Sequence, residues 1–383
     1  MREKTSKIFN LFKKFEDLSA IGIANFSGTA ISTIFWLYLA TIISTVEYGQ
    51  ISYFIAIGSL GSVFSLIGGG ATITVFTAKK IPIASAILFI SISISIISAA
   101  AILIIIQNPI VSAYVIGYSI FGLSNAYLLG EKKFKKYSKI FILQKIIFVT
   151  LALVFNNIIG PTGVVLAVAL SFFIHSHTVF KIFTSMKKDF PLLRTKMNFM
   201  MNNYGKDISR VLFSQLDKII IAPFFGFALL GNYYLGLQFL SALSIIPVII
   251  VQYTLTHDAS GSPTYRLKKV IVGLSIIMAT LGITVAPHVL PSFFPKFVDA
   301  STIVQILSIA IVPRTISMMY ASKFLGTEKS KIVLIGAIVA LSVQIPLLFS
   351  LGTIIGVNGI AMALVISETV LMTYYIVIHR RMR

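Results

Sequence analysis

The sequence predicts an all-α polytopic membrane protein with twelve transmembrane helices in two six-helix lobes, related by a pseudo-two-fold axis along the membrane normal. Composition, charge placement and an internal repeat each support this prediction. Hydrophobic residues make up 57% of the 383 residues, charged residues 11%, and the mean hydropathy is +0.93. Soluble domains average about 45 to 50% apolar and about 25% charged residues.

Apolar stretches of about 20 residues, long enough to cross a hydrocarbon core about 30 Å thick, recur along the chain. We predict spans near 19–42, 51–78, 82–106, 109–129, 138–156, 161–180, 208–226, 231–254, 267–290, 302–322, 332–352 and 357–378. The predicted parts are a basic leader (1–18), an N-terminal lobe (19–180), a basic cytoplasmic linker (181–207), a C-terminal lobe (208–378) and a cytoplasmic tail (379–383). No small-residue cleavage site follows the leader, so we expect the first span to be uncleaved.

The formal charge of +20 would indicate nucleic-acid binding in a soluble protein, but the positions of the cations argue against it here. The loop cations lie in the leader, the even-numbered connectors and the tail, whereas the odd-numbered connectors contain Lys296 alone. The linker cations are Lys181, Lys187, Lys188, Arg194, Lys196 and Lys206. Basic loops are retained on the cytoplasmic side. We therefore expect a multi-pass cell-membrane protein with both termini in the cytoplasm and no nucleic-acid partner.

An internal repeat relates the two halves. The segment IIGPTGVVLAVALS from Ile158 matches IIGVNGIAMALVIS from Ile354, and LGEKKFKKYSK from Leu129 matches LGTEKSK from Leu325, both at an offset of 196. A weaker match relates the surroundings of Gly49 to those of Gly231 at an offset of 182. Because six spans is an even number, both halves enter the membrane in the same direction. This predicts an axis along the membrane normal and a cavity at the interface.

The predicted seventh helix carries charged side chains inside the hydrocarbon core, where a charge costs free energy. From near Ile208 it places Arg210, Ser214 and Asp217 on one face, at spacings of four and three, with Lys218 beside them. At 1.5 Å per residue, Asp217 lies roughly 13 Å inside this helix, near the middle of the hydrocarbon core. An ionisable side chain at that depth indicates a functional site.

Away from the span ends, three further charged residues lie within predicted spans: Lys145, Arg314 and Glu368. For Arg210 and Lys145, snorkelling to headgroups is as well supported as substrate binding, because both lie near cytoplasmic helix ends. For Lys218 and Arg314 we favour lining of the cavity over a purely structural ion pair with Asp217 or Glu368, and the two roles are compatible.

The first span carries a polar stripe of Asn25, Thr29, Ser32 and Trp36 at spacings of four, three and four. Cavity lining and ordinary helix packing both account for such a stripe. Trp36 is the only tryptophan, and sugar stacking and helix packing are equally weighted for it. Asn25 and Trp36 are therefore candidate substrate contacts.

No catalytic or cofactor motif is complete. The absence of cysteine excludes disulfides, thiol catalysis and Cys-ligated metals. GFALLGN from Gly226 lacks the Lys and Ser/Thr of a phosphate loop, because Asn232 and Tyr233 stand there. His175 and His177 are two apart on a helix and face different directions. We expect no cofactor, no metal site and no enzymatic activity.

The residues that carry a family likeness are IANFSGTAISTIFWLYLATIISTVEYGQISYFIAI in the first two helices, SQLDKIIIAPFFGFALLGNYYLGLQ from the seventh, and the GxxG turns before helices 6 and 12. Over its whole length the chain resembles the multidrug/oligosaccharidyl-lipid/polysaccharide exporter (MOP) superfamily, in its prokaryotic branch of polysaccharide, O-antigen-type flippases. The resemblance implies the acid and base of helix 7 at Asp217 and Lys218. Glu368 and Lys145 match no family motif, and their assignment rests on position alone.

The leading interpretation is a flippase that moves a polyprenyl-(di)phosphate-linked oligosaccharide from the cytoplasmic to the outer leaflet by alternating access. Lipid-linked oligosaccharide and membrane lipids are then its partners, we expect a monomer, and coupling to Na⁺ or H⁺ stays open. The first alternative is a cation-coupled small-molecule or multidrug antiporter of the same fold, which needs fewer deep cations because its typical substrates are cationic. A membrane glycan polymerase is disfavoured, since the external connectors are only a few residues long.

Overall fold

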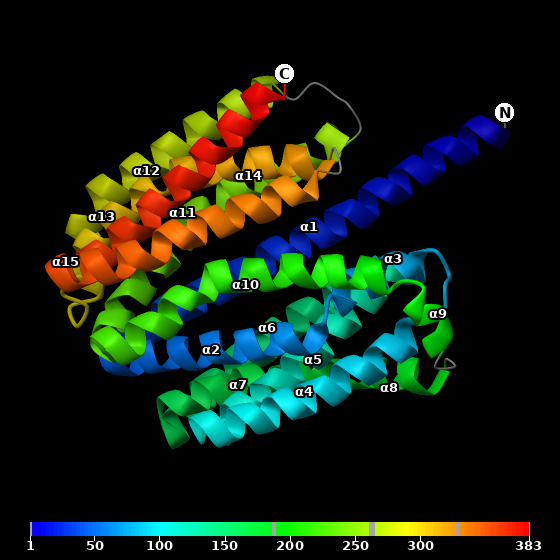
Figure 1. Ribbon diagram of the computed structural model, residues 1–383, viewed down its shortest axis with the longest axis horizontal. Coiled ribbons are helices and arrows are strands. Elements are labelled where there is room, and N and C mark those ends of the chain that lie inside the picture. Colours follow the sequence, from blue (N-terminus) through cyan, green and yellow to red (C-terminus); the bar gives the residue numbers. More distant parts are fainter. Residues whose placement is uncertain (1, 186–188, 260–264, 327–328, 383) are drawn as a thin grey trace. The chain divides into compact units, whose positions relative to one another are not determined.

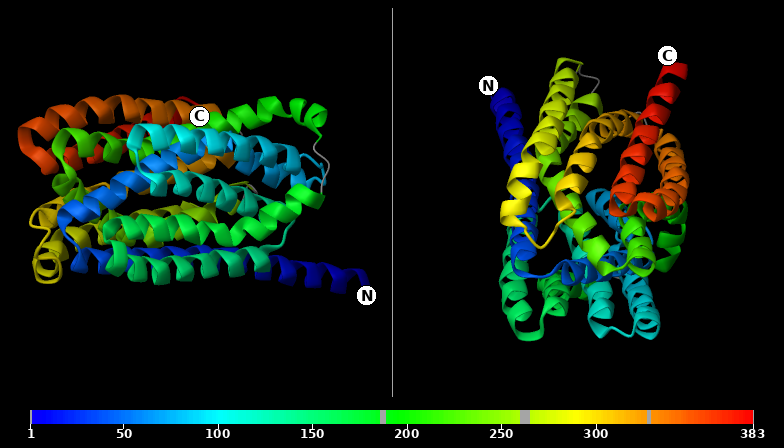
Figure 2. Two further views of the ribbon diagram at one scale, coloured as in Figure 1. Left: turned by 90° about the horizontal axis from the view of Figure 1, so that it is seen from below. Right: turned by 90° about the vertical axis from the view of Figure 1, so that its left-hand side faces the viewer.

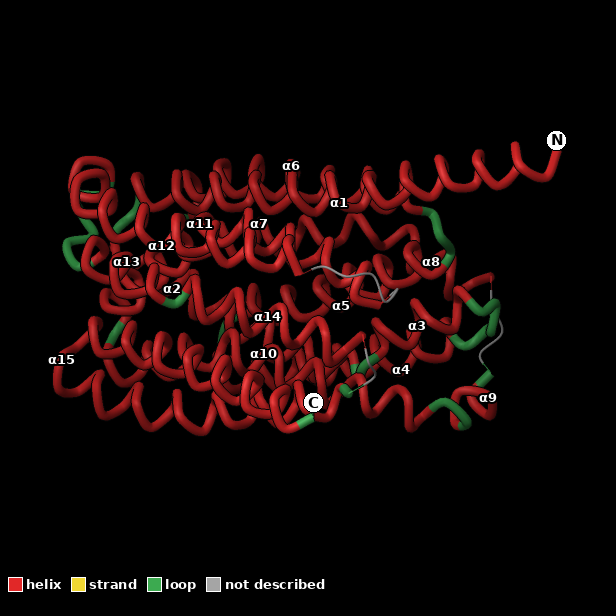
Figure 3. The backbone as a smooth tube through the Cα atoms, turned by 90° about the horizontal axis from the view of Figure 1, so that it is seen from above, coloured by secondary structure: helices red, strands yellow, loops and turns green. Residues whose placement is uncertain are grey.

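The computed structural model describes residues 2–185, 189–259, 265–326 and 329–382, and throughout these ranges the regular structure is helical (Figure 3). Lys187 and Lys188 of the predicted linker, and residues 327–328 of the repeated connector motif, lie outside the described residues. The elements, labelled in Figure 1, are α1 (Arg2–Ile42), α2 (Thr45–Leu66), α3 (Gly69–Ala78), α4 (Ala84–Ile106), α5 (Pro109–Gly130), α6 (Phe134–Ile159), α7 (Pro161–Phe172), η1 (Phe173–His175), α8 (Ser176–Ser185), α9 (Phe190–Arg194), α10 (Met197–Phe225), α11 (Phe227–Ala259), α12 (Tyr265–Phe293), α13 (Ala300–Ile309), α14 (Ile311–Gly326) and α15 (Ser330–Arg381). The all-α prediction is confirmed.

Within the described ranges, nine helical stretches are long and apolar enough to cross a membrane. The longest, α15, contains two of the predicted spans, because its backbone leaves helical geometry at Ile355 and Gly356. The two halves run antiparallel, since the Tyr375 hydroxyl donates a hydrogen bond to the Val333 carbonyl. Figures 1 and 2 show them side by side, in orange and red.

The chain divides into two compact units, residues 1–35 with 54–211 and residues 36–53 with 212–383. Each unit has its own apolar core, formed around Ile87 and Leu123 in the first and around Leu307 and Ile360 in the second. The grouping of residues 36–53 with the C-terminal half is not apparent from the sequence. The lobe boundaries at 19–180 and 208–378, and the axis relating the lobes, stay predictions.

Backbone contacts explain why residues 36–53 pack in the second unit. A Cβ atom at Gly49 would meet the Phe227 carbonyl, and one at Gly231 would meet the Thr45 carbonyl. Only glycine allows backbones to approach this closely. These are the two glycines that the weaker repeat aligns.

Lys296 also joins this segment to the second unit. Its Nζ donates hydrogen bonds to the Ile42 and Ile43 carbonyls, 3.2 and 3.5 Å away, where α1 ends. An ammonium group at this position satisfies orphan carbonyls and complements the negative end of the helix dipole. The one cation of the odd-numbered connectors therefore has a local structural role.

The repeat at offset 196 recurs in the local geometry of each unit. Gly160 and Gly356 both have positive φ, at 71° and 59°. Gly163 and Gly359 both lie against a carbonyl eight residues earlier in the chain. The hydroxyls of Ser171 and Ser367 both hydrogen-bond the carbonyl three residues before. The sequence repeat is therefore also a structural repeat.

The predicted start of the seventh helix near Ile208 is wrong. Helix α10 begins at Met197, because most of the polar linker is itself helical. The N-terminal end of α10 packs on Gly68, where a Cβ would meet the Met200 carbonyl. Asp217 is better located from the other end of α10, eight residues before Phe225 and so about 12 Å along the helix axis.

Candidate functional site

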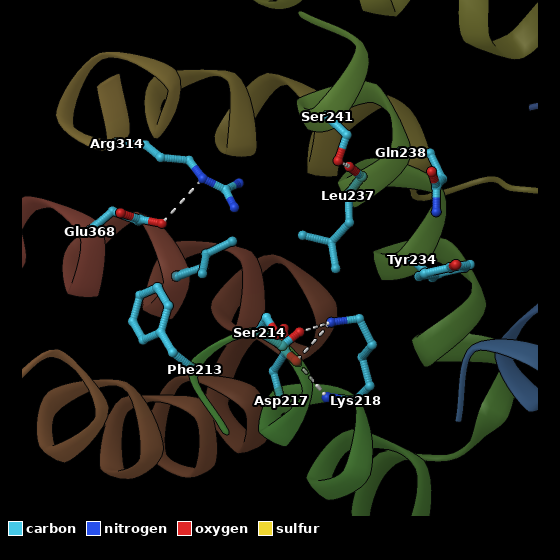
Figure 4. Close-up of a pocket in the computed structure, with 11 residues that line it drawn as sticks. Phe213, Ser214, Asp217, Lys218, Tyr234, Leu237, Gln238, Ser241, Arg314 and Glu368 are labelled. Carbon is cyan, nitrogen blue, oxygen red and sulfur yellow. Dashed lines mark hydrogen bonds and ion pairs between the residues drawn. The ribbon is translucent and has the colours of Figure 1, made fainter. Parts of the chain in front are cut away.

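A cavity of about 220 Å³ lies within the second unit, among α10, α11, α14 and the second half of α15 (Figure 4). Its lining residues are Phe213, Ser214, Asp217, Lys218, Tyr234, Leu237, Gln238, Ser241, Arg314, Leu364 and Glu368. The structure thus brings together four of the eight predicted site residues. Helical rise places Asp217 and Tyr234 about 10 to 12 Å from the turn at Gly226 that joins α10 to α11. In a bilayer whose surface lies at that turn, this depth would be inside the hydrocarbon core.

Asp217 and Lys218 form a buried ion pair that makes several further hydrogen bonds. Oδ1 of Asp217 lies 3.0 Å from the Lys218 Nζ, and the two side chains are 4% and 9% exposed. The same oxygen accepts the Lys218 backbone N–H at 2.8 Å, while Oδ2 accepts the Tyr233 hydroxyl at 2.8 Å. Lys218 also donates to the Ser214 carbonyl. Both charges are neutralised within the unit, as buried ions require.

Arg314 and Glu368 form a looser pair. The Arg314 Nε lies 3.6 Å from the Glu368 Oε1, which is an ion pair but longer than a hydrogen bond. The glutamate is 4% exposed and the arginine 39%. In Figure 4 the terminal nitrogens of the guanidinium point away from Glu368, toward the interior of the cavity. Arg314 therefore offers hydrogen-bond donors to a ligand while it neutralises a buried carboxylate.

The cavity wall opposite these ion pairs comes from α11. Tyr234, Gln238 and Ser241 line it at spacings of four and three, which place them on one helix face. These three residues are not among the predicted site residues, although their spacing is visible in the sequence. Tyr233, which was considered only as a mismatch to a phosphate loop, is fully buried and bonds Asp217.

Two other predicted site residues make local contacts in the first unit. Lys145 Nζ lies 5.5 Å from the Phe141 ring centroid, a cation–π contact. Asn25 accepts a hydrogen bond of 3.1 Å from the Tyr137 hydroxyl. The structure accounts for both residues by packing within this unit and places neither among the cavity-lining residues.

Arg210 and Trp36 also lie outside the cavity lining. Arg210 is 69% exposed, pairs with Asp207 at 3.1 Å and is grouped with the first unit. The Trp36 ring packs edge-on against Tyr48 and Tyr234 in the second unit, with ring centroids 6.4 and 5.9 Å apart. Trp36 therefore lies behind a residue that lines the cavity.

No protein-family model and no curated protein matches the sequence. Solved structures do match. The lipid II flippase MurJ in an inward closed conformation superposes with a TM-score of 0.77 at 13% identity, over 94% of this chain and 87% of that one. An inward-facing multidrug resistance MATE family transporter of the MOP superfamily superposes with a TM-score of 0.67 at 14% identity, over 93% and 94%. A MOP superfamily transporter from Pyrococcus furiosus, described by the reverse polarity of its binding pocket, gives 0.56 at 15% identity, over 96% and 95%.

The chain has the MOP superfamily fold. The likeness spans nearly all of both chains, so it covers both units. At these identities it concerns the fold, and the chemistry of the cavity has to be argued from the residues of this chain. Within the MOP fold, this chain places two cations and two carboxylates around one cavity of its second unit.

Proposed function

We propose that this protein is a transporter of the MOP type that flips a polyprenyl-(di)phosphate-linked oligosaccharide across the membrane. The observation that carries the proposal is the Arg314 guanidinium, which faces a cavity between apolar helices with its terminal nitrogens turned into that cavity. A guanidinium presents a planar fork of donors that matches phosphate oxygens. The TM-score to the lipid II flippase, 0.77 against 0.67 and 0.56 for the two other transporters compared, supports the same direction.

The size of the cavity indicates which part of such a substrate it receives. Its volume of about 220 Å³ lies below the roughly 300 to 1,000 Å³ typical of sites for drug-sized ligands. A phosphate or diphosphate group, or one sugar ring, fits this space, whereas an oligosaccharide does not. We therefore assign the cavity to the charged part of the head group.

Electrical energy favours the export of such a head group from a negative interior. Each charge moved through 100 mV contributes about 2.3 kcal/mol, so a diphosphate carrying about two negative charges gains roughly 4 to 5 kcal/mol. No nucleotide is required for this step. Coupling to Na⁺ or H⁺ stays open, and a proton that crosses together with the head group reduces the net charge moved by one and this gain by about 2.3 kcal/mol per 100 mV.

A cation-coupled multidrug antiporter is the second candidate, because MATE transporters share the fold. A cationic drug needs a carboxylate that is available to pair with it. Here Asp217 is bonded to Lys218 and Tyr233, and Glu368 faces Arg314. A cationic substrate would have to displace a cation of the protein, so the antiporter is the weaker proposal.

Proteoliposomes loaded with a polyprenyl-diphosphate-linked oligosaccharide test the function. Flipping is measured as the fraction of glycan that an impermeant lectin or glycosidase reaches with time. We expect Arg314→Gln to reduce the rate at least tenfold. Lys133→Gln, in a loop where Lys133 pairs with Glu131 at 2.8 Å, is the matched control and should keep the wild-type rate.

The same proteoliposomes discriminate between the two functions. Efflux of ethidium driven by an imposed Na⁺ or H⁺ gradient, without glycan movement, would overturn the flippase and favour the antiporter. Glycan movement without ethidium efflux is the result that we expect. Amounts of folded protein are compared by size-exclusion chromatography, so that lost transport is not confused with lost protein.

A further inference from the structure

We propose that the Arg314–Glu368 pair is a proton-linked anion switch. A phosphate-type anion binds Arg314 and draws the guanidinium away from Glu368, and Glu368 then takes up one proton. This rests on the proposed function for the identity of the anion as the phosphate of a lipid-linked ligand. It adds that binding of the anion and binding of a proton are one event at this site.

The geometry of the pair makes the exchange feasible. Contact between Arg314 and Glu368 is through Nε at 3.6 Å, while the terminal nitrogens point into the cavity. An anion that binds those nitrogens in a bidentate manner draws the guanidinium toward itself. Glu368, only 4% exposed, is then left in a low-dielectric environment without its counter-ion. A buried carboxylate in that position becomes neutral by binding a proton.

The groups around Glu368 leave Arg314 as its neutralising partner. Among the described residues, the titratable and charged groups that face this region are Arg314 from α14, Tyr233 and Tyr234 from α11, Asp217 and Lys218 from α10, and Tyr375 from α15 itself. Packed against α15 as well, α13 carries no titratable residue. Lys218 is held by Asp217 and by the Ser214 carbonyl. It therefore cannot replace Arg314 without breaking its own buried ion pair.

The internal repeat indicates that the fold itself does not require this ion pair. At the offset of 196, Arg314 corresponds to Tyr118 and Glu368 to Phe172. In the first unit those two rings pack edge-on, with centroids 5.5 Å apart. The alignment at an offset of 196 holds at these positions, because the hydroxyls of Ser119 and its equivalent Thr315 both hydrogen-bond the carbonyl four residues before. The same pair of helices is thus joined by uncharged rings in one unit and by charges in the other.

The exchange balances in charge and in atoms. In the free protein the guanidinium neutralises the carboxylate. In the complex the guanidinium neutralises a phosphate oxygen, and a proton released by a buffer acid in the solvent neutralises the carboxylate. No covalent bond of the ligand forms or breaks.

Calorimetric titration of the purified full chain in detergent with farnesyl diphosphate tests the switch. Titrations at one pH in two buffers of different ionisation enthalpy give the number of protons taken up. Because the anion binds together with a proton, we expect one more proton for the wild type than for Glu368→Gln. The wild-type affinity should fall about tenfold per pH unit as the pH rises, relative to that variant. Protons that the ligand itself takes up or releases contribute equally for both proteins, so they cancel in the comparison.

Two further variants complete the test. Arg314→Gln should abolish binding. The double variant Arg314→Tyr, Glu368→Phe copies the pair of the first unit, so it should reach wild-type levels of folded protein and bind no farnesyl diphosphate. Equal proton uptake in the wild type and Glu368→Gln would overturn the switch, as would the absence of farnesyl diphosphate binding to the wild type. Proton-linked binding in a protein that flips no glycan would instead overturn the proposed function and leave the switch standing.

Discussion

The Tyr233 hydroxyl donates a hydrogen bond of 2.8 Å to Oδ2 of Asp217, the carboxylate oxygen opposite the one that Lys218 contacts. Tyr233 is fully buried, and it comes from α11 whereas the ion pair comes from α10. One neutral and one charged donor therefore hold the carboxylate between two helices. This arrangement stabilises the second unit at the depth where the cavity lies.

Removal of Asp217 should destabilise the protein strongly. Asp217→Ala leaves the Lys218 ammonium buried without its counter-ion, a change that typically costs about 3 to 5 kcal/mol. We expect a clear loss of monodisperse protein in detergent and a lower unfolding temperature. The double variant Asp217→Asn, Lys218→Met, which removes both charges, should recover most of the loss. Equal damage in the single and double variants would contradict the ion-pair explanation.

The substitution Tyr233→Phe removes the hydroxyl and keeps the ring, so it measures the contribution of the hydrogen bond to Asp217. Hydrogen bonds to charged groups contribute about 1.5 to 3 kcal/mol, so we expect a smaller destabilisation than for Asp217→Ala. Thermal unfolding followed by size-exclusion chromatography measures the difference. In an Asp217→Asn background the effect of Tyr233→Phe should shrink, since the acceptor is then neutral. Full additivity of the two substitutions would argue against a direct bond.

The contact between residues 36–53 and α11 depends on two glycines. Alanine at Gly49 or Gly231 places a Cβ against a backbone carbonyl, Phe227 or Thr45, and backbone atoms do not move aside cheaply. We expect each substitution to reduce the yield of folded protein several-fold. Gly273→Ala is the matched control, because its Cβ would meet no atom within 4 Å and alanine favours a helix. Normal yields for Gly49→Ala and Gly231→Ala would mean that the helices separate freely here.

The absence of cysteine makes the native chain a ready background for mapping topology. Val298→Cys labels the connector after α12, where the side chain is 82% exposed, and Lys133→Cys labels the connector between α5 and α6. In intact cells, an impermeant maleimide should react with the first and not the second, since basic connectors stay inside. A reporter fused at Arg383 should be cytoplasmic. Labelling of Lys133→Cys from outside would overturn the predicted orientation.

The sequence alone was sufficient to predict the all-helical fold and the repeat, because both are encoded locally. Bilayer thickness sets the length of an apolar span, so hydropathy predicts spans from residue order. Likewise, Gly160 and Gly356 interrupt helices through their own positive φ angles, which are a local property of the chain. Asp217, Lys218, Arg314 and Glu368 were identifiable as candidates because charge inside a span is rare whatever surrounds it.

Only the tertiary structure decided which of these charges meet. Asp217 bonds Tyr233, sixteen residues away on another helix, and Arg314 pairs with Glu368 across α14 and α15. Such contacts depend on how the helices pack, which the periodicity of one helix does not specify. For the same reason Arg210, on the same helical face as Asp217, pairs instead with Asp207 in the first unit. The sequence determined where charge enters the membrane, and packing determined which charges face one cavity.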